Sequence, residues 1–171
     1  MNKVIAIANQ KGGVGKTTTA VNIAASLAAT KRRTLLVDLD PQGNATTATG
    51  VDRLSSQTLY SHYFEKTPIN KCIQKTKDNY DVIPGSDELI ALEISIRSDG
   101  NQAFLSKSMK DLESKYDYTI IDTPPTLNQL TIEGLLCASG TLIPLQCEYY
   151  SLEGVAGLMN TIDTLSNKNM T

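Results

Sequence analysis

Two lysines and two threonines stand among glycines near the start of the chain, in the sequence QKGGVGKTT of residues 10–18. This stretch follows the apolar run of residues 4–8 and precedes an alanine-rich segment. Because glycine lacks a Cβ atom, backbone N–H groups in such a loop can turn inward onto an anion. The N-terminus of a following helix adds partial positive charge. The pattern predicts a phosphate cradle that consists of Lys11, Gly12, Gly13, Val14, Gly15, Lys16, Thr17 and Thr18.

Two side chains at the end of residues 10–18, named the phosphate loop below, have separate chemical tasks. Lys16, a flexible point charge, is expected to reach the β- and γ-phosphates of a nucleotide, and the Thr17 hydroxyl is expected to ligate Mg²⁺. The usual spacing, G-x-x-x-x-G-K-[ST], would place a glycine at the position of Gln10. This chain instead has a second lysine, Lys11, directly after it. The loop predicts a site for a nucleotide with Mg²⁺, in a variant of the usual spacing.

Carboxylates follow two other apolar runs of the chain. Asp122 closes the run of residues 118–122, where it can hold Mg²⁺ directly or through water. Asp38 and Asp40 end the run that starts at Thr34, and side chains two residues apart project to the same side of an extended chain. The carboxyl ends of strands are where α/β sheets place their ligands. We therefore expect these carboxylates to lie beside the phosphate loop.

Three motifs together resemble those of the ParA/MinD group of ATPases. Residues 11–18 are similar to its deviant Walker A loop, K-G-G-x-G-K-T-[ST]. Residues 38–44 are similar to its switch I, D-x-D-P-Q-x-N, and residues 122–125 to its switch II, D-[TC]-P-P. The resemblance extends from Val4 to about Gly157 and is strongest to the ParA/Soj type, which partitions chromosomes or plasmids.

The resemblance implies specific roles for these residues. Lys11 would be the signature lysine that reaches the phosphates of the partner subunit's ATP. Asp40 would orient or deprotonate the attacking water, and Asp38 would support the Mg²⁺ shell. The implied catalytic residues are Lys11, Lys16 and Asp40, and the implied metal ligands are Thr17, Asp38 and Asp122.

The family resemblance also implies a slow, Mg-dependent ATPase that acts as a switch. Its members form a homodimer through an ATP sandwich, bind DNA nonspecifically and are stimulated by a ParB-type centromere-binding protein. We expect a cytoplasmic, nucleoid-associated protein with no membrane partner. ParA-type chains run longer and add strands, an adenine-recognising loop and a basic C-terminal helix that binds DNA. This chain is expected to lack those C-terminal parts.

A segment near the end of the chain leaves two interpretations open. Residues 144–154 resemble the P-x-x-x-E-x-x-S-x-x-G segment of ParA proteins. In one interpretation Gln146 and Glu148 lie near the nucleotide or the dimer seam, and in the other Ser151 simply caps the last helix. Asn44, a further polar residue of switch I, has no assigned role.

Three alternative functions remain in view. A MinD-like ATPase that positions the division site shares the deviant loop but needs a C-terminal amphipathic membrane helix. A reductase of the nitrogenase iron-protein type needs cluster cysteines near switch II, and residues 123–138 contain only Cys137. A nucleotide-binding regulator without hydrolysis would bind ATP and release no phosphate.

Short apolar runs alternate with helical patterns along the chain. This alternation predicts an α/β fold of the three-layer P-loop NTPase type, with a mostly parallel sheet flanked by helices, in one domain of residues 1–171. Strands are expected at residues 3–9, 34–38, 80–84, 118–122 and 140–145. Helices are expected at residues 16–29, 101–116, 128–138 and 152–165, with a loop over residues 41–58 and a short helix and an edge element over residues 58–76.

The composition fits this interpretation. Of the 171 residues 40% are hydrophobic and 20% charged, and the net charge of −2 gives no global basic field for nucleic acid. No apolar run approaches the roughly 20 residues that span a bilayer. Three cysteines without C-x-x-C spacing indicate free thiols in a reducing compartment. The single histidine, His62, stands beside aromatic residues and is expected to have a packing role.

Overall fold

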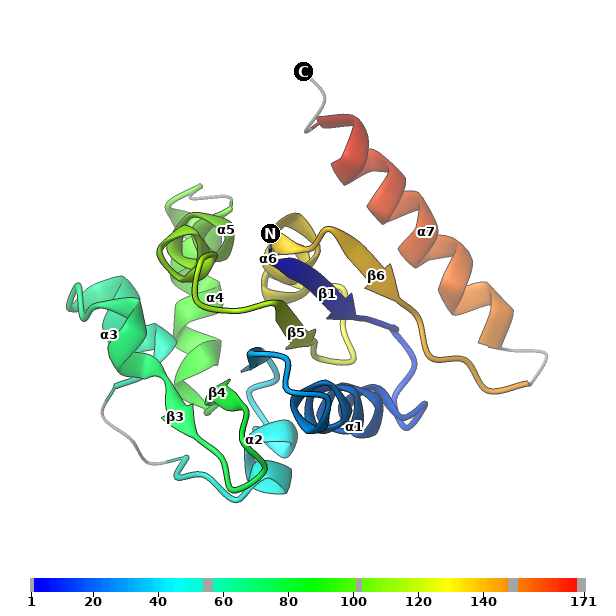
Figure 1. Ribbon diagram of the computed structural model, residues 1–171. Coiled ribbons are helices and arrows are strands. Elements are labelled where there is room, and N and C mark those ends of the chain that lie inside the picture. The colour runs from blue at the N-terminus through cyan, green and yellow to red at the C-terminus, as the bar shows by residue number, and fades with distance from the viewer. Residues whose placement is uncertain (1, 54–56, 101–102, 148–150, 169–171) are drawn as a thin grey trace.

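A six-stranded sheet forms the centre of the protein in the computed structural model, which describes residues 2–53, 57–100, 103–147 and 151–168. The strands lie in the order β3, β4, β2, β5, β1, β6 (Figure 1). Neighbouring strands are parallel, except that β3 is antiparallel to β4. The strands span Lys3–Ile7 (β1), Thr34–Asp38 (β2), Gln74–Lys75 (β3), Asp81–Ile83 (β4), Tyr118–Asp122 (β5) and Gly140–Leu142 (β6).

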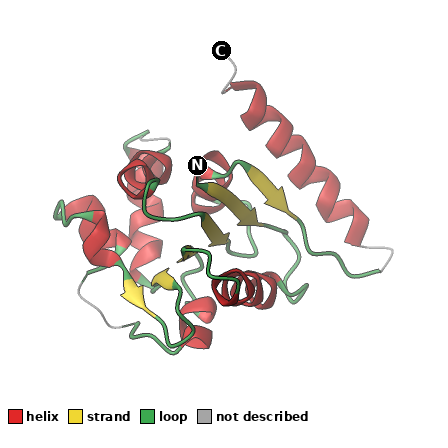
Figure 2. Ribbon diagram, viewed as in Figure 1, coloured by secondary structure: helices red, strands yellow, loops and turns green. Residues whose placement is uncertain are grey.

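Helices cover both faces of the sheet and complete three layers (Figure 2). Helices α1 and α2 pack on one face, and the remaining helices pack on the other. This arrangement confirms the predicted fold class. The helices span Lys16–Ala29 (α1), Asn44–Thr49 (α2), Leu59–Phe64 (α3), Glu88–Ser98 (α4), Phe104–Met109 (α5), Gln129–Cys137 (α6) and Ser151–Lys168 (α7), with 3₁₀ turns at Ile69–Cys72 and Lys110–Leu112.

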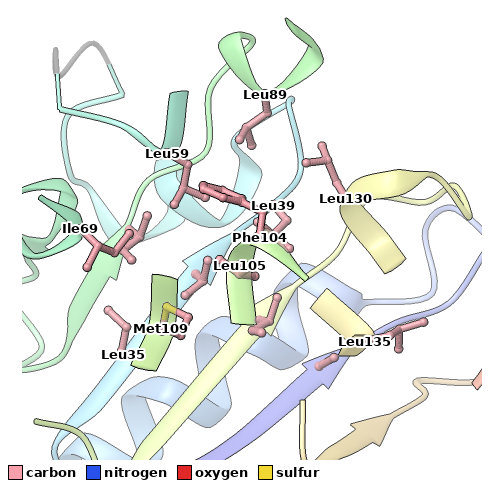
Figure 3. Close-up of a cluster of buried hydrophobic side chains, with 14 of the residues drawn as sticks. Leu35, Leu39, Leu59, Ile69, Leu89, Phe104, Leu105, Met109, Leu130 and Leu135 are labelled. Carbon is pink, nitrogen blue, oxygen red and sulfur yellow. The ribbon is translucent and has the colours of Figure 1, made fainter. Parts of the chain in front are cut away.

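The central strand β2 shows why the sequences of these strands are continuous apolar runs. All five of its residues are buried, since both faces of the sheet are covered. Leu35 and Val37 point into the larger core cluster, whereas Leu36 points into the cluster beneath α1. Figure 3 shows the larger cluster, where leucines of α4 and α6 meet Phe104 and Leu105 of α5. Burial of such side chains contributes about 25 cal/mol per Å² of apolar surface, which makes this core the main stabilising element.

The parallel register brings three loops to one edge of the sheet. Ile7 at the end of β1 is the register partner of Asp122 at the end of β5. Asp38 at the end of β2 is also a partner of Asp122. The segments that follow these three strands therefore emerge side by side, and they carry the motifs identified in the sequence.

Several predicted elements are confirmed with their bounds. Helix α1 spans residues 16–29 as predicted, and β2 and β5 span residues 34–38 and 118–122. The first and last strands are shorter than predicted, because β1 ends at Ile7 and β6 at Leu142. In α1, Ala24 and Ala28 are buried, and Val21, Ala25 and Leu27 are half-buried.

The structure corrects three expectations between residues 41 and 116. Residues 41–58 were expected to form a loop but contain α2, which is held by tertiary hydrogen bonds that local sequence does not reveal. Helix α4 occupies a stretch for which no element was expected, although Leu89, Leu92 and Ile96 have the helical spacing of a buried face. The single helix expected over residues 101–116 is instead the short helix α5 followed by a 3₁₀ turn, and residues 101–102 lie outside the described residues.

His62 has the packing role expected of it. Its Nδ1 lies 2.6 Å from the Thr67 carbonyl oxygen and its Nε2 lies 2.8 Å from Ser108 Oγ, so that it links α3 to α5. The ring also packs near Phe104, at 5.5 Å between centroids. Within the described ranges, none of the helices is long and apolar enough to cross a bilayer.

Candidate nucleotide-binding site

The phosphate loop has the backbone of an anion cradle. Gly13 and Gly15 have φ angles of 74° and 89°, in a backbone region that residues other than glycine rarely adopt. A Cβ atom added at Gly12, Gly13 or Gly15 would meet no atom within 4 Å apart from those of its chain neighbours, so the space beside these glycines is open. Gly15 precedes α1 without any side-chain cap, and the first turn of α1 contains no acidic residue. The first N–H groups of α1 are therefore available to an anion.

A pocket of about 430 Å³ opens over this loop, within the size range of small-molecule sites. It joins the phosphate loop to the segments that follow β2 and β5. Its lining residues are Gly12, Gly13, Gly15, Lys16, Thr17, Thr18, Asp40, Asn44 and Pro125. The structure thus brings most of the predicted site residues to one pocket, and it gives Asn44, which had no assigned role, a place on the rim.

Lys16 is directed back onto its own loop. It is only 7% exposed, and its Nζ donates a hydrogen bond to the Lys11 carbonyl oxygen at 3.1 Å. Burial lowers the pKa of Lys16, and attraction to Asp122 and Asp40 opposes this lowering. A phosphate in the cradle would offer Lys16 a charged acceptor, which forms stronger hydrogen bonds than a neutral carbonyl.

Asp122 is a buried carboxylate that Thr17 and Lys16 compensate only in part. Its side chain is fully buried, and neither oxygen has a hydrogen-bond partner among the residues that the structure describes. Burial raises the pKa of Asp122 to about 7, and repulsion from Asp38 and Asp40 adds to the rise, while the neighbouring Thr17 hydroxyl and Lys16 oppose it. A buried charge of this kind is costly unless a cation accompanies it.

These residues fit a magnesium ion that is shared with a nucleotide. The carboxylate of Asp122 and the hydroxyl of Thr17 are hard oxygen ligands of the kind Mg²⁺ prefers. In the described part of the chain, no three His, Cys, Asp or Glu side chains converge into a cation site. Mg²⁺ is usually held by one or two protein oxygens together with substrate phosphates and water. The site is therefore suited to Mg²⁺ only when phosphate oxygens complete the coordination.

Asp38 is equally buried, but its carboxylate is occupied by hydrogen bonds. Its Oδ2 accepts from Thr46 N at 2.8 Å and from Thr46 Oγ1 at 2.7 Å, and its Oδ1 accepts from Asp40 N at 3.1 Å. Burial raises the pKa of Asp38, and these hydrogen bonds oppose the rise. The predicted support of the Mg²⁺ shell by Asp38 remains a prediction, since the contacts in the structure are to switch I itself.

Asp40 lies in the same pocket as the phosphate loop, on the segment that follows β2. It is 7% exposed and lines the pocket opposite the phosphate loop. Its Oδ1 accepts a hydrogen bond from Gln42 N at 2.9 Å, which fixes the turn that follows it. The roles of Asp40 as catalytic group and of Lys11 as a residue acting in the partner's site remain predictions.

Two polar side chains form hydrogen bonds with the phosphate loop. Asn9, which the sequence analysis did not single out, is only 3% exposed. Its Oδ1 accepts a hydrogen bond from Lys11 N at 3.0 Å, and its Nδ2 donates one to the Pro144 carbonyl oxygen at 2.7 Å. Gln146 Nε2 donates to the Gly13 carbonyl oxygen at 3.3 Å. The position of an asparagine between an apolar run and a glycine-rich loop could have indicated the Asn9 contact from the sequence. Gln146 therefore lies at the loop, as one of the two interpretations held, whereas Glu148 lies outside the described residues.

Comparisons with known proteins agree with this geometry. The model of the family AAA_31, described as an AAA domain, matches residues 2–171. The chain is 47% identical over 167 residues to the chromosome partitioning protein ParA of Myxococcus xanthus, which covers 95% of this chain and 59% of that protein. It is 44% identical over 165 residues to the sporulation initiation inhibitor protein Soj of Bacillus subtilis, which covers 95% of this chain and 65% of that protein.

A solved structure shows the same fold. Cobyrinic acid a,c-diamide synthase from Mycobacterium smegmatis, with bound ATP analog and magnesium, superposes with a TM-score of 0.92 at 34% identity. The match covers 98% of this chain and 69% of that one, whereas the chain spans only 59–65% of the length of the two curated relatives. The chain belongs to the AAA_31 family and, within it, to the ParA/Soj type of the ParA/MinD superfamily.

Proposed function

We propose that residues 1–171 form one ATPase domain of a switch that partitions chromosomes or plasmids. One observation supports this most strongly: an uncapped phosphate loop faces Asp122, a buried carboxylate without a hydrogen-bond partner among the described residues. The two features suit a triphosphate and its cation, and neither is stabilising without them. The names of the ParA and Soj relatives support the partitioning role.

The proposed chemistry is phosphoryl transfer from ATP to water, in which positioning and charge neutralisation dominate. Lys16 and the amides of the phosphate loop bind the β- and γ-phosphates. Asp40 orients the attacking water and accepts its proton. Thr17 and Asp122 would hold Mg²⁺, which neutralises charge on the phosphate oxygens when bound. Asp38 contributes by holding the segment that carries Asp40.

We further propose that ATP joins two copies of the protein. Lys11 of each copy would stabilise charge on the nucleotide of the other, so that hydrolysis releases the dimer. Such a timing switch is expected to hydrolyse ATP weakly alone and faster with a ParB-type partner, and to act in the cytoplasm at the nucleoid. Nonspecific DNA binding belongs to the same proposal.

Phosphate release from Mg-ATP tests the enzymatic part. The wild-type protein is expected to release phosphate slowly, and Lys16→Ala and Asp40→Ala are expected to abolish the release. Asp40→Ala should still bind a non-hydrolysable ATP analogue, because the phosphate contacts remain. Binding of ATP by the wild type without any phosphate release would favour the non-hydrolysing regulator instead.

Sedimentation with and without Mg-ATP tests the dimer. We expect Lys11→Gln to bind ATP nearly as well as the wild type but to remain monomeric. Lys77→Gln is the matched control, since Lys77 is an exposed lysine in the turn between β3 and β4, at the edge of the sheet opposite the pocket. Dimerisation of Lys11→Gln with ATP would refute the role given to Lys11.

A further inference from the structure

Thr46 connects three segments at the edge of the sheet. It is fully buried in α2, and its Oγ1 donates to Asp38 Oδ2 at the end of β2 at 2.7 Å. The same Oγ1 accepts a hydrogen bond from Gly85 N, two residues after β4, at 2.8 Å. One hydroxyl thus acts as donor and as acceptor between β2, α2 and the loop after β4.

The carboxylate of Asp38 joins switch I, residues 38–44, and the start of α2 into a ring of hydrogen bonds. Its Oδ1 accepts from Asp40 N and its Oδ2 accepts from Thr46 N and Thr46 Oγ1, so one side chain holds both ends of residues 40–46. Gly43 N donates to the Asp40 carbonyl oxygen at 2.8 Å inside the ring. The position of Asp40 therefore depends on contacts made six residues later in the chain.

Gly85 allows the loop after β4 to approach closely. A Cβ atom at this position would lie 2.8 Å from Asp38 Cγ and 2.8 Å from the Asp40 carbonyl oxygen, too close for any side chain. The Gly85 N–H can reach Thr46 Oγ1 only because of this approach. Loss of the hydroxyl would leave a buried N–H without its acceptor and remove a donor from Asp38, and buried polar groups without partners destabilise the arrangement that buries them.

We propose that Thr46 is a positioning residue for hydrolysis, which acts through Asp38 on Asp40. Because Thr46 is fully buried, it has no surface with which to touch the nucleotide. Its effect reaches the reaction through the placement of Asp40 in the pocket, and a misplacement of about 1 Å in an active site can cost on the order of a hundredfold in rate. This inference rests on the proposed ATPase function and deepens it.

Three variants test the proposal. Thr46→Val removes the hydroxyl at nearly constant volume, and Thr46→Ser restores it. Thr49→Val is the matched control, because Thr49 is buried in the same helix and, among the described residues, its hydroxyl donates to the Thr46 carbonyl oxygen at 2.7 Å and to neither Asp38 nor Gly85. Two measurements are made on each: amide hydrogen exchange of the ligand-free protein, and steady-state hydrolysis of Mg-ATP.

We expect Thr46→Val to increase exchange at the amides of residues 43–50 and at Gly85 at least tenfold. The same variant is expected to lower kcat at least tenfold and to change KM for ATP less than threefold. Thr46→Ser should keep kcat within threefold of the wild type, and Thr49→Val should leave both measurements near wild-type values. If Thr46→Val does not fold, Thr46→Cys, with its weaker S–H donor, should give intermediate exchange and kcat.

Several results would overturn the proposal. One is unchanged amide exchange in Thr46→Val, and another is a loss of kcat in Thr46→Ser or Thr49→Val as large as in Thr46→Val. A parallel loss of kcat and ATP affinity in Thr46→Val would also overturn it, as would Thr46→Cys with wild-type exchange and kcat. Failure of the proposed function is seen separately, as ATP binding by the wild type without phosphate release. In that case the exchange pattern still decides whether Thr46 holds Asp40.

Discussion

Asp38 and Asp122 end neighbouring strands, are partners in the register of the sheet and are both fully buried, yet their surroundings differ. Asp38 accepts three hydrogen bonds from switch I, whereas Asp122 accepts none from the described residues. The same side chain at the same depth therefore has two different surroundings. Asp38 is bonded within switch I, whereas Asp122 is the carboxylate that we propose for a cation.

The difference teaches how a buried charge identifies a binding site. Proteins bury charges with partners, because an unpaired charge in a low dielectric costs several kcal/mol. Where the partner is absent from the protein itself, the partner is expected to come from outside. An aspartate with partners in the protein and one that awaits a ligand can be equally buried and can both stand at a strand end. The number of hydrogen bonds that the carboxylate accepts distinguishes the two.

The largest effect is expected from Asp122→Asn. An amide is a poorer ligand for Mg²⁺ than a carboxylate, so the variant should lower kcat for Mg-ATP about a hundredfold or more, the range found when a group that stabilises the transition state is removed. Phosphate release and the Mg²⁺ dependence of nucleotide binding measure this effect. Wild-type hydrolysis in this variant would show that Asp122 has no part in the metal site.

Asp38→Asn is expected to act on stability, in the opposite direction to Asp122→Asn. The amide NH₂ replaces one carboxylate acceptor and places a donor against an N–H donor of switch I. The free energy of unfolding, measured in urea at pH 8, should therefore be about 2 kcal/mol lower than in the wild type. Asp122→Asn, which removes an uncompensated charge, should be more stable than the wild type under the same Mg-free conditions. A shift of both variants in the same direction would remove the distinction between the two carboxylates.

A further expected effect is a pH dependence of stability that belongs to Asp122. Its folded-state pKa of about 7 lies above the value of about 4 in an unfolded chain, so its contribution to stability is full below pH 4 and is lost as the pH rises to about 7. The stability gained by Asp122→Asn should therefore grow between about pH 4 and pH 7 and level off above that. Urea unfolding of both proteins at about pH 5, 6, 7 and 8, with chelator, measures the difference, and a constant difference would contradict the raised pKa.

Much of the site was predictable because its parts are local in sequence. The phosphate loop needs glycines, a lysine and a threonine in one short stretch between a strand and a helix, and each strand of the buried sheet is a short apolar run. Parallel strands place their carboxyl ends at one edge, so the sequence predicted that the motifs share this edge. The structure added that β2, β5 and β1 are neighbours in the sheet. Helix α1 was found with its bounds for the same reason, since alanines and the preceding glycine mark it locally.

Other features depended on contacts between distant residues. Helix α2 forms in a stretch rich in threonine, glycine and asparagine, which favour turns, because Thr46 bonds to Asp38 at the end of β2 and to Gly85 after β4. Asn9 bonds to Lys11 two residues away and to Pro144, 135 residues away. The local sequence could have indicated the first contact, but it does not contain the second.

The sequence by itself determined the fold class, the positions of the principal strands along the chain and the presence of a phosphate loop with acidic partners, because these follow from periodicity and from motifs a few residues long. Only the tertiary structure decided the surroundings of each acidic residue. Asp38 and Asp122 both close apolar strands, but among the described residues the folded chain brings three hydrogen bonds to Asp38 and none to Asp122.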